Sequence, residues 1–135
     1  MTGETATIIL PLPPSILSPN HPPCSRNGRF AHAAAAKRYR RLACEATKAE
    51  DIAGPWERAT VAATFFHKTD RRRDDVNHLG MLKPAYDGIV EAGLLVDDDS
   101  EHLTTLPAQF RIDRENPRVE LRLARVCGSD HPEHP

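Results

Sequence analysis

Two acidic groups and a run of arginines are the residues of this chain most suited to chemistry. Three arginines at positions 71–73 are followed directly by Asp74 and Asp75, and three aspartates occupy positions 97–99. Two carboxylates brought to 4 Å repel by about 4 kcal/mol at an effective dielectric near 20. A Mg²⁺ ion between them reverses that sign and also binds a phosphate oxygen. Together with phosphate-binding arginines, the acids predict metal-assisted cleavage of a nucleic-acid backbone.

Length and composition narrow the class of protein. The chain has 135 residues, enough for one domain with a modest core, and a net charge of −1, so nucleic-acid binding must come from local basic patches. Cys24, Cys44 and Cys127 form no C-x-x-C pair, which argues against a disulfide framework or zinc ribbon and fits the cytoplasm. The sequence contains no membrane span, signal segment or phosphate-binding glycine motif, so we expect no membrane contact and no nucleotide cofactor.

The first half of the chain predicts a strand, a loop and a helix. Residues 6–10 are apolar and β-branched, which indicates a strand. The proline-rich stretch 11–23 excludes a helix or a central strand. Residues 31–51 consist mostly of good helix formers. We expect Lys37, Arg38, Arg40 and Arg41 on one face of this helix and alanines with Leu42 on the other.

The second half must position the acids. Residues 59–67 predict a central strand that leads to Lys68 and the arginines. Residues 77–92 predict a second helix, kinked near Gly80 by Pro84 and ended by Gly93. Segments 109–113 and 119–126 predict a hairpin. The expected fold is one α+β domain at 1–128, a mixed β-sheet backed by two main helices and assembled as a dimer, with 129–135 as a disordered tail.

The second helix joins the two acidic groups, so its ends can meet at one sheet edge and form a metal site. Each part also has a plain structural interpretation. Asp75 or Asn77 can cap a helix, and the aspartates at 97–99 can form a solvated turn. The arginines can neutralise neighbouring aspartates, and Lys83 can be a surface lysine. The combination of all four features favours the metal site over these separate roles.

Several ordered motifs then resemble a known family. The stretch LPLPPS at 10–15, followed by Asn20 and His21, resembles the amino-terminal signature of the RusA family of Holliday junction resolvases. DDVN at 74–77, KPAYDG at 83–88 and AGLLVDD at 92–98 resemble its D-x-D-N, K-P-x-x-D-G and A-G-x-x-x-D-D motifs. The resemblance runs from about Ile8 to Asp98.

The resemblance implies a crossover junction endodeoxyribonuclease of DNA recombination and repair. It would be a homodimer that uses Mg²⁺ or Mn²⁺ to cut a DNA four-way junction by paired nicks, because a two-fold dimer supplies two symmetric active sites. Asp74 matches the first motif acid, Asp98 matches the acid after the helix, and Lys83 matches the motif lysine.

One position departs from the family pattern. The second motif acid falls at position 76, where this chain has Val76, and valine cannot ligate a metal. Asp75 is adjacent and can take its place if the turn differs locally, or Asp97 can contribute instead.

We therefore predict Asp74, Asp75 and Asp98 as metal ligands and, with Lys83, as the catalytic residues. The predicted DNA-binding residues are Lys37, Arg38, Arg41, Lys68, Arg71, Arg72 and Arg73. The runner-up is a catalytically weakened or inactive junction-binding module, in which Val76 marks lost activity. A third interpretation is a small interaction protein whose proline-rich loop serves as a polyproline II ligand.

Overall fold

A computed structural model describes residues 4–18, 25–69 and 75–126 of the chain. In helix α2, the side chains of residues 75–77 are not described. Several expectations lie outside the described residues: those for the arginines at 71–73, for Asp74, for Asn20 and His21, and for the tail at 129–135.

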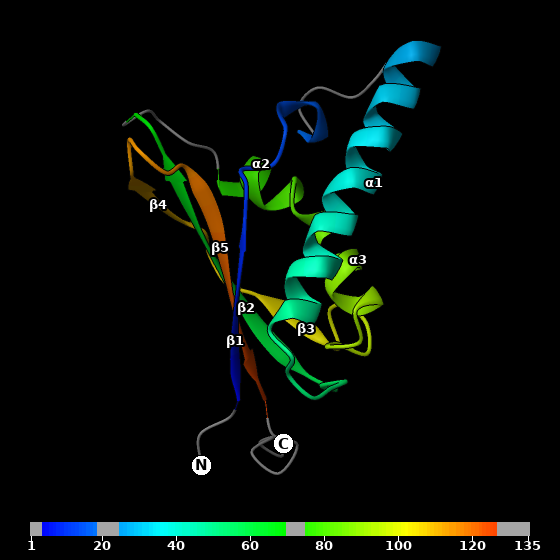
Figure 1. Ribbon diagram of the computed structural model, residues 1–135, viewed down its shortest axis with the longest axis vertical. Helices are drawn as coiled ribbons and strands as arrows, with labels where there is room; N and C mark the ends of the chain where they lie inside the picture. Colours follow the sequence, from blue (N-terminus) through cyan, green and yellow to red (C-terminus); the bar gives the residue numbers. More distant parts are fainter. Residues whose placement is uncertain (1–3, 19–24, 70–74, 127–135) are drawn as a thin grey trace.

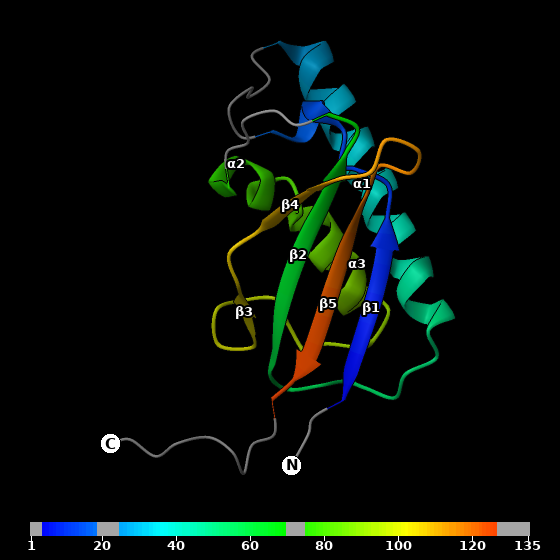
Figure 2. The ribbon, with the colours of Figure 1, turned by 90° about the vertical axis from the view of Figure 1, so that its left-hand side faces the viewer.

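One mixed sheet of five strands forms the framework of the fold (Figure 2). The strands are β1 (Thr5–Leu10), β2 (Ala59–His67), β3 (Leu103–Thr105), β4 (Gln109–Ile112) and β5 (Arg118–Arg125). Strand β5 lies between β1 and β2 and is antiparallel to both, whereas β3 and β4 run parallel to β2 along its other edge. The α+β class and the central position of residues 59–67 are therefore confirmed.

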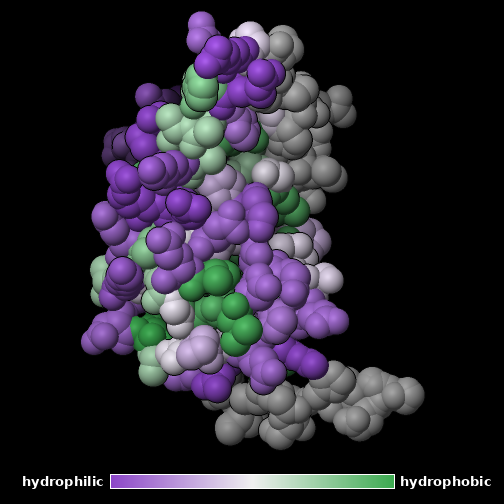
Figure 3. Space-filling view, turned by 90° about the vertical axis from the view of Figure 1, so that its right-hand side faces the viewer, coloured by the Kyte–Doolittle hydropathy of each residue, from purple (hydrophilic) through white to green (hydrophobic). Residues whose placement is uncertain are grey.

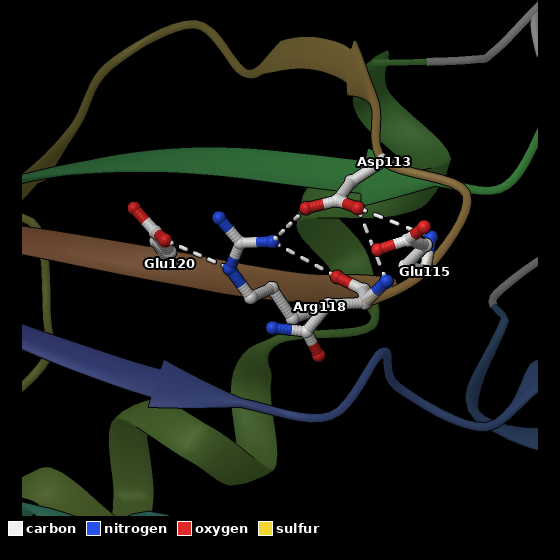
Figure 4. Close-up of polar contacts among 5 residues, drawn as sticks. Asp113, Glu115, Arg118 and Glu120 are labelled. Carbon is white, nitrogen blue, oxygen red and sulfur yellow. Dashed lines mark hydrogen bonds and ion pairs between the residues drawn. The ribbon is translucent and has the colours of Figure 1, made fainter.

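The predicted hairpin of residues 109–113 and 119–126 is wrong. Strands β4 and β5 do not pair with each other, because β2 lies between them and pairs with both. The burial of β2 alternates along almost its whole length, and a central strand needs hydrogen-bonding partners on both edges. The connection at 113–117 consequently crosses the end of β2, where Arg118 binds Asp113 and the carbonyl of Asn116 (Figure 4).

The helices cover one face of the sheet (Figure 1). They are α1 (Arg26–Ala49), α2 (Asp75–Gly80) and α3 (Lys83–Glu91), with a short 3-10 turn, η1 (Ser15–Leu17). Helix α1 begins before the predicted residue 31 because Ser25 caps it, with its hydroxyl oxygen accepting from the Gly28 amide at 3.0 Å. None of the helices in the described residues is long and apolar enough to cross a membrane.

The predicted second helix is divided into α2 and α3. Pro84 lies in the first turn of α3, where a missing amide hydrogen costs no helical bond, so the chain ends one helix and starts another instead of kinking. Gly93 ends α3 as predicted. It has a φ of 94°, its amide donates to Val90, and the amide of Leu94 donates to Ile89.

The core lies between the sheet and the helices. Its fully buried side chains include Phe65, Leu121, Leu82 and Ile89. Helix α1 buries Ala35, Tyr39, Ala43, Cys44 and Thr47. Leu42 is 44% exposed, so its predicted place on the packed face is wrong, because the buried stripe follows positions 35, 39 and 43 in steps of one helical turn.

Candidate active site

Lys83 joins two carboxylates at the start of α3. Its Nζ lies 2.6 Å from Oδ2 of Asp98 and 2.9 Å from Oδ1 of Asp87. Asp87 lies one turn further along α3, whereas Asp98 lies in the loop that follows α3. Two of the residues predicted as catalytic, Lys83 and Asp98, are therefore in direct contact.

The segment before Asp98 is held by a short backbone bridge. Leu94 and Leu95 are buried, the Trp56 amide donates to the Leu94 carbonyl at 2.6 Å, and the Val96 amide donates to the Trp56 carbonyl at 3.1 Å. The Asp98 amide then donates to Oδ1 of Asp97 at 2.7 Å. The aspartates at 97–99 thus follow directly after a segment that is fixed by hydrogen bonds. This explains how a surface loop keeps Asp98 beside α3.

The two partners differ in exposure. The side chain of Lys83 is 63% exposed, and that of Asp98 is 11% exposed. The hydrogen bond to Asp98, followed by that to Asp87, raises the pKa of Lys83 above its ordinary value. The ammonium group therefore stays charged and open to solvent, while the carboxylate is largely covered.

Tyr86 lies one turn after Lys83 on α3. Its ring is buried, and its hydroxyl has no hydrogen-bond partner among the described residues. Burial, and then the nearby charge of Asp98, raise the pKa of the Tyr86 phenol. The phenol therefore stays protonated and remains a hydrogen-bond donor.

A second group of ligand atoms lies in the loop after Val96. Atoms of Asp97, Asp99 and His102 lie within 4.8 Å of one another and can hold a metal ion. His102 Nδ1 is 2.6 Å from Oδ1 of Asp99, and this bond raises the pKa of His102 and lowers that of Asp99. Carboxylate oxygens suit Mg²⁺ or Mn²⁺, and an imidazole nitrogen favours Mn²⁺ over Mg²⁺.

His102 was not among the ligands predicted from the sequence. Its only signal was the spacing of Asp99 and His102, three residues apart, which places both side chains on one side of a tight turn. Among the other predicted ligands, Asp74 lies outside the described residues and Asp75 is the first residue of α2, with its side chain not described. Their convergence on Asp98 stays a prediction.

Helix α2 is fixed to the sheet by rings. The His78 ring packs edge-to-face on Phe65, His67 and Phe110, with centroid distances of 4.9, 5.3 and 5.0 Å. His78 thus has a packing role, and it was not among the predicted site residues. The contact places the helix that begins at Asp75 beside the carboxyl end of β2.

A basic groove runs between α1 and α3. One hollow of about 330 Å³ is lined by Lys37, Arg40, Arg41, Cys44, Glu45, Lys48 and Glu91. A neighbouring hollow of about 400 Å³ is lined by Ala33, Ala36, Lys37, Arg40, Pro84 and Asp87. The two hollows share Lys37 and Arg40, and Asp87, which lines the second hollow, also binds Lys83. The face of the molecule that carries α1 is largely hydrophilic (Figure 3).

The predicted DNA-binding residues fall partly on this groove. Lys37 and Arg41 line it, whereas Arg38 is exposed on α1 and lines neither hollow. Lys68 is exposed just past the end of β2. No protein-family model matches the chain, and a comparison with curated proteins finds no match. The resemblance to the RusA family therefore rests on the motifs themselves.

Proposed function

We propose that this protein is a structure-selective DNA endonuclease, dependent on Mg²⁺ or Mn²⁺, that cuts four-way junctions as a homodimer. The observation that carries the proposal is the contact of Lys83 with Asp98 at 2.6 Å. The two residues match the motif lysine and the motif acid, and they meet beside Asp97, Asp99 and His102, which can hold a metal ion. A charged lysine beside acids that can bind a metal ion is suited to phosphodiester cleavage.

The roles of the residues follow from their chemistry. Asp98, with Asp74 and Asp75, would hold the divalent ion. When bound, the ion neutralises phosphate charge and lowers the pKa of its water. The Lys83 ammonium, exposed and charged, is placed to contact a phosphate oxygen. Asp87 keeps the ammonium near Asp98, because it binds the same Nζ.

The groove between α1 and α3 would take the sugar-phosphate chain. Lys37 and Arg40 line both of its hollows, and Asp87 connects it to Lys83. Lysine and arginine contacts to phosphates give salt-dependent binding that does not depend on base sequence. Recognition would then depend on junction shape, with Arg38, Lys68 and the arginines at 71–73 adding backbone contacts.

The test is cleavage of a synthetic four-way junction beside a linear duplex of the same sequence. We expect paired nicks in the junction only, and only with Mg²⁺ or Mn²⁺. Asp98→Asn and Asp74→Asn should each reduce the rate by more than about 100-fold, since metal affinity depends on every ligand. The control is Asp113→Asn, which makes the same chemical change in the separate ion pair with Arg118 and should keep its activity. Unchanged cleavage in both site variants would refute the proposal.

Val76 favours one second candidate, a module that binds junctions without cutting them. Valine offers no ligand atom, so the loss of one acid can leave binding intact while activity is lost. Tight, metal-independent junction binding without nicks would support this alternative. The third interpretation, a polyproline ligand, has less support, because Pro13 is buried and the Tyr39 hydroxyl donates to the Pro11 carbonyl at 2.7 Å.

A further inference from the structure

The hydroxyl of Tyr86 is a buried hydrogen-bond donor without an acceptor. The side chain is 7% exposed, and no described residue accepts from its oxygen. Nearly all buried polar groups in folded proteins have a partner, so an exception calls for a reason such as a ligand or water that completes the site. The ring itself is well packed, and a phenylalanine would satisfy that packing equally well.

The negative charge of Asp98 acts on this hydroxyl and, after burial, raises the pKa of the Tyr86 phenol. Tyr86 follows Lys83 by three residues on α3, so the two side chains lie on adjacent turns of one helix face. Lys83 binds Oδ2 of Asp98, and within the described residues no hydrogen bond reaches Oδ1. Among the described residues, a donor without an acceptor thus lies one helical turn from the lysine that binds Asp98.

We propose that Tyr86 is a positioning residue for Asp98, whose hydroxyl donates to the Asp98 carboxylate when a divalent ion is bound there. The inference rests on the proposed function. Carboxylates that bind metals are usually held by a hydrogen bond of their own, and losing that bond typically costs 10- to 100-fold in metal affinity. A phenol suits the role because it keeps its proton and, unlike a lysine, adds no charge to compete with the metal.

Tyr39 provides a matched control. It is also buried, at 2% exposure, but its hydroxyl is committed to the Pro11 carbonyl at 2.7 Å. Tyr86→Phe and Tyr39→Phe each remove one buried oxygen atom. Only the first removes a donor that has no acceptor among residues 4–18, 25–69 and 75–126, so the two variants separate a role in the site from a role in stability.

The experiment measures Mn²⁺ binding to the full-length chain by calorimetry, together with the melting temperature of each variant. Tyr86→Phe should weaken Mn²⁺ binding by about 10- to 100-fold and leave the melting temperature unchanged or higher. Tyr39→Phe should lower the melting temperature and leave Mn²⁺ binding unchanged. The series is repeated in a His102→Ala background, which removes a ligand from the neighbouring cluster, so that the ion at Asp98 is measured alone.

Asp98→Asn separates failure of the inference from failure of the proposed function. If Asp98→Asn weakens Mn²⁺ binding and Tyr86→Phe does not, the role of Tyr86 is overturned while the metal site stands. If Asp98→Asn has no effect, or the wild-type chain binds no Mn²⁺, the metal site and the inference are both overturned. A melting temperature that falls in Tyr86→Phe as far as in Tyr39→Phe would show that Tyr86 is structural.

Discussion

Two regions of the molecule share one arrangement of charge, a single cation between two carboxylates. One region is Lys83 with Asp87 and Asp98, and the other is Arg118 with Asp113 and Glu120. Arg118 also donates to the Asn116 carbonyl (Figure 4). Its guanidinium carbon lies 3.9 Å from the centre of the Phe66 ring. The Arg118 side chain is 19% exposed, compared with 63% for Lys83.

Geometry, more than charge, therefore distinguishes a structural cluster from one available to a ligand. A guanidinium is a planar fork, and Arg118 uses it to bind two carboxylates and a carbonyl while stacking on a ring. It therefore fixes the connection between β4 and β5. Lys83 has one amine on a flexible stem, open to solvent, which can turn toward a phosphate at little cost.

The largest effect is expected from removing each cation in turn. Lys83→Met should lower the junction cleavage rate by about 10²- to 10³-fold, because it removes the charge that would face the phosphate in the proposed site, and should change stability by less than about 1 kcal/mol. Arg118→Met should do the opposite: cleavage per folded molecule is retained and the melting temperature falls. Cleavage rates and melting temperatures of the two variants are measured in parallel. Equal activity in the two variants would contradict the assignment of Lys83 to the site and of Arg118 to the structure.

Gly88→Ala should disturb the Lys83 region alone. A Cβ at position 88 would collide with the Arg40 carbonyl oxygen and would lie 2.9 Å from the Cys44 amide nitrogen and 3.0 Å from the Ala43 Cβ, so α3 has to move away from α1. We expect a loss of about 1–3 kcal/mol in unfolding free energy by urea denaturation, together with slower cleavage.

A second substitution checks the cause of that loss. Ala43→Gly should not rescue Gly88→Ala, because the closest contact of the new Cβ is with backbone, which cannot turn aside. Full recovery of stability in the double variant would show that the Ala43 side chain, and not the Arg40 carbonyl, sets the distance between the helices.

The smallest expected effect is a difference in how the stability of the Lys83 and Arg118 clusters depends on pH. Lys83 has a raised pKa, so its contribution is present below the ordinary lysine value of 10.5 and is lost as pH rises through the folded value. The hydrogen bond from Arg118 lowers the pKa of Asp113, so this contribution is present above the ordinary value of 3.8 and is lost as pH falls through the folded value.

Thermal scans across pH measure both limbs. Lys83→Met should flatten the alkaline limb of the stability profile, and Asp113→Asn should flatten the acid limb. An alkaline limb that Lys83→Met leaves unchanged, or an acid limb that Asp113→Asn leaves unchanged, would contradict these assignments.

Local patterns predicted the elements well where the decisive interactions are close in sequence. Strand β2 matches the predicted residues 59–67, because alternating β-branched and aromatic residues are typical of a buried strand. Gly93 was predicted to end a helix because a left-handed turn favours glycine. The break between α2 and α3 was predicted only as a kink in one helix, since the sequence does not show whether neighbouring contacts stabilise a separate turn.

Interactions between distant segments were predicted less well. Alternation identified β4 and β5 as strands, but it does not identify the partner of a strand, so β2 between them was missed. The motifs predicted Lys83 and Asp98 as site residues. Nothing near Tyr86 in the sequence shows that its hydroxyl lacks an acceptor, because that depends on how α1, α3 and the loop after Val96 pack together.

The place of β5 in the sheet has a consequence for how the chain folds. Ile8 lies opposite Leu121, and Thr5 lies opposite Ala124, so within the described residues β1 pairs only with a strand more than a hundred positions later. During synthesis, β1 and β2 therefore lack β5, the strand that pairs with both, until residue 125 has left the ribosome. Such distant pairing slows folding and leaves strand edges open to other chains in the meantime. Yield in the cell is therefore expected to depend on how well a nascent chain is shielded until its sheet closes.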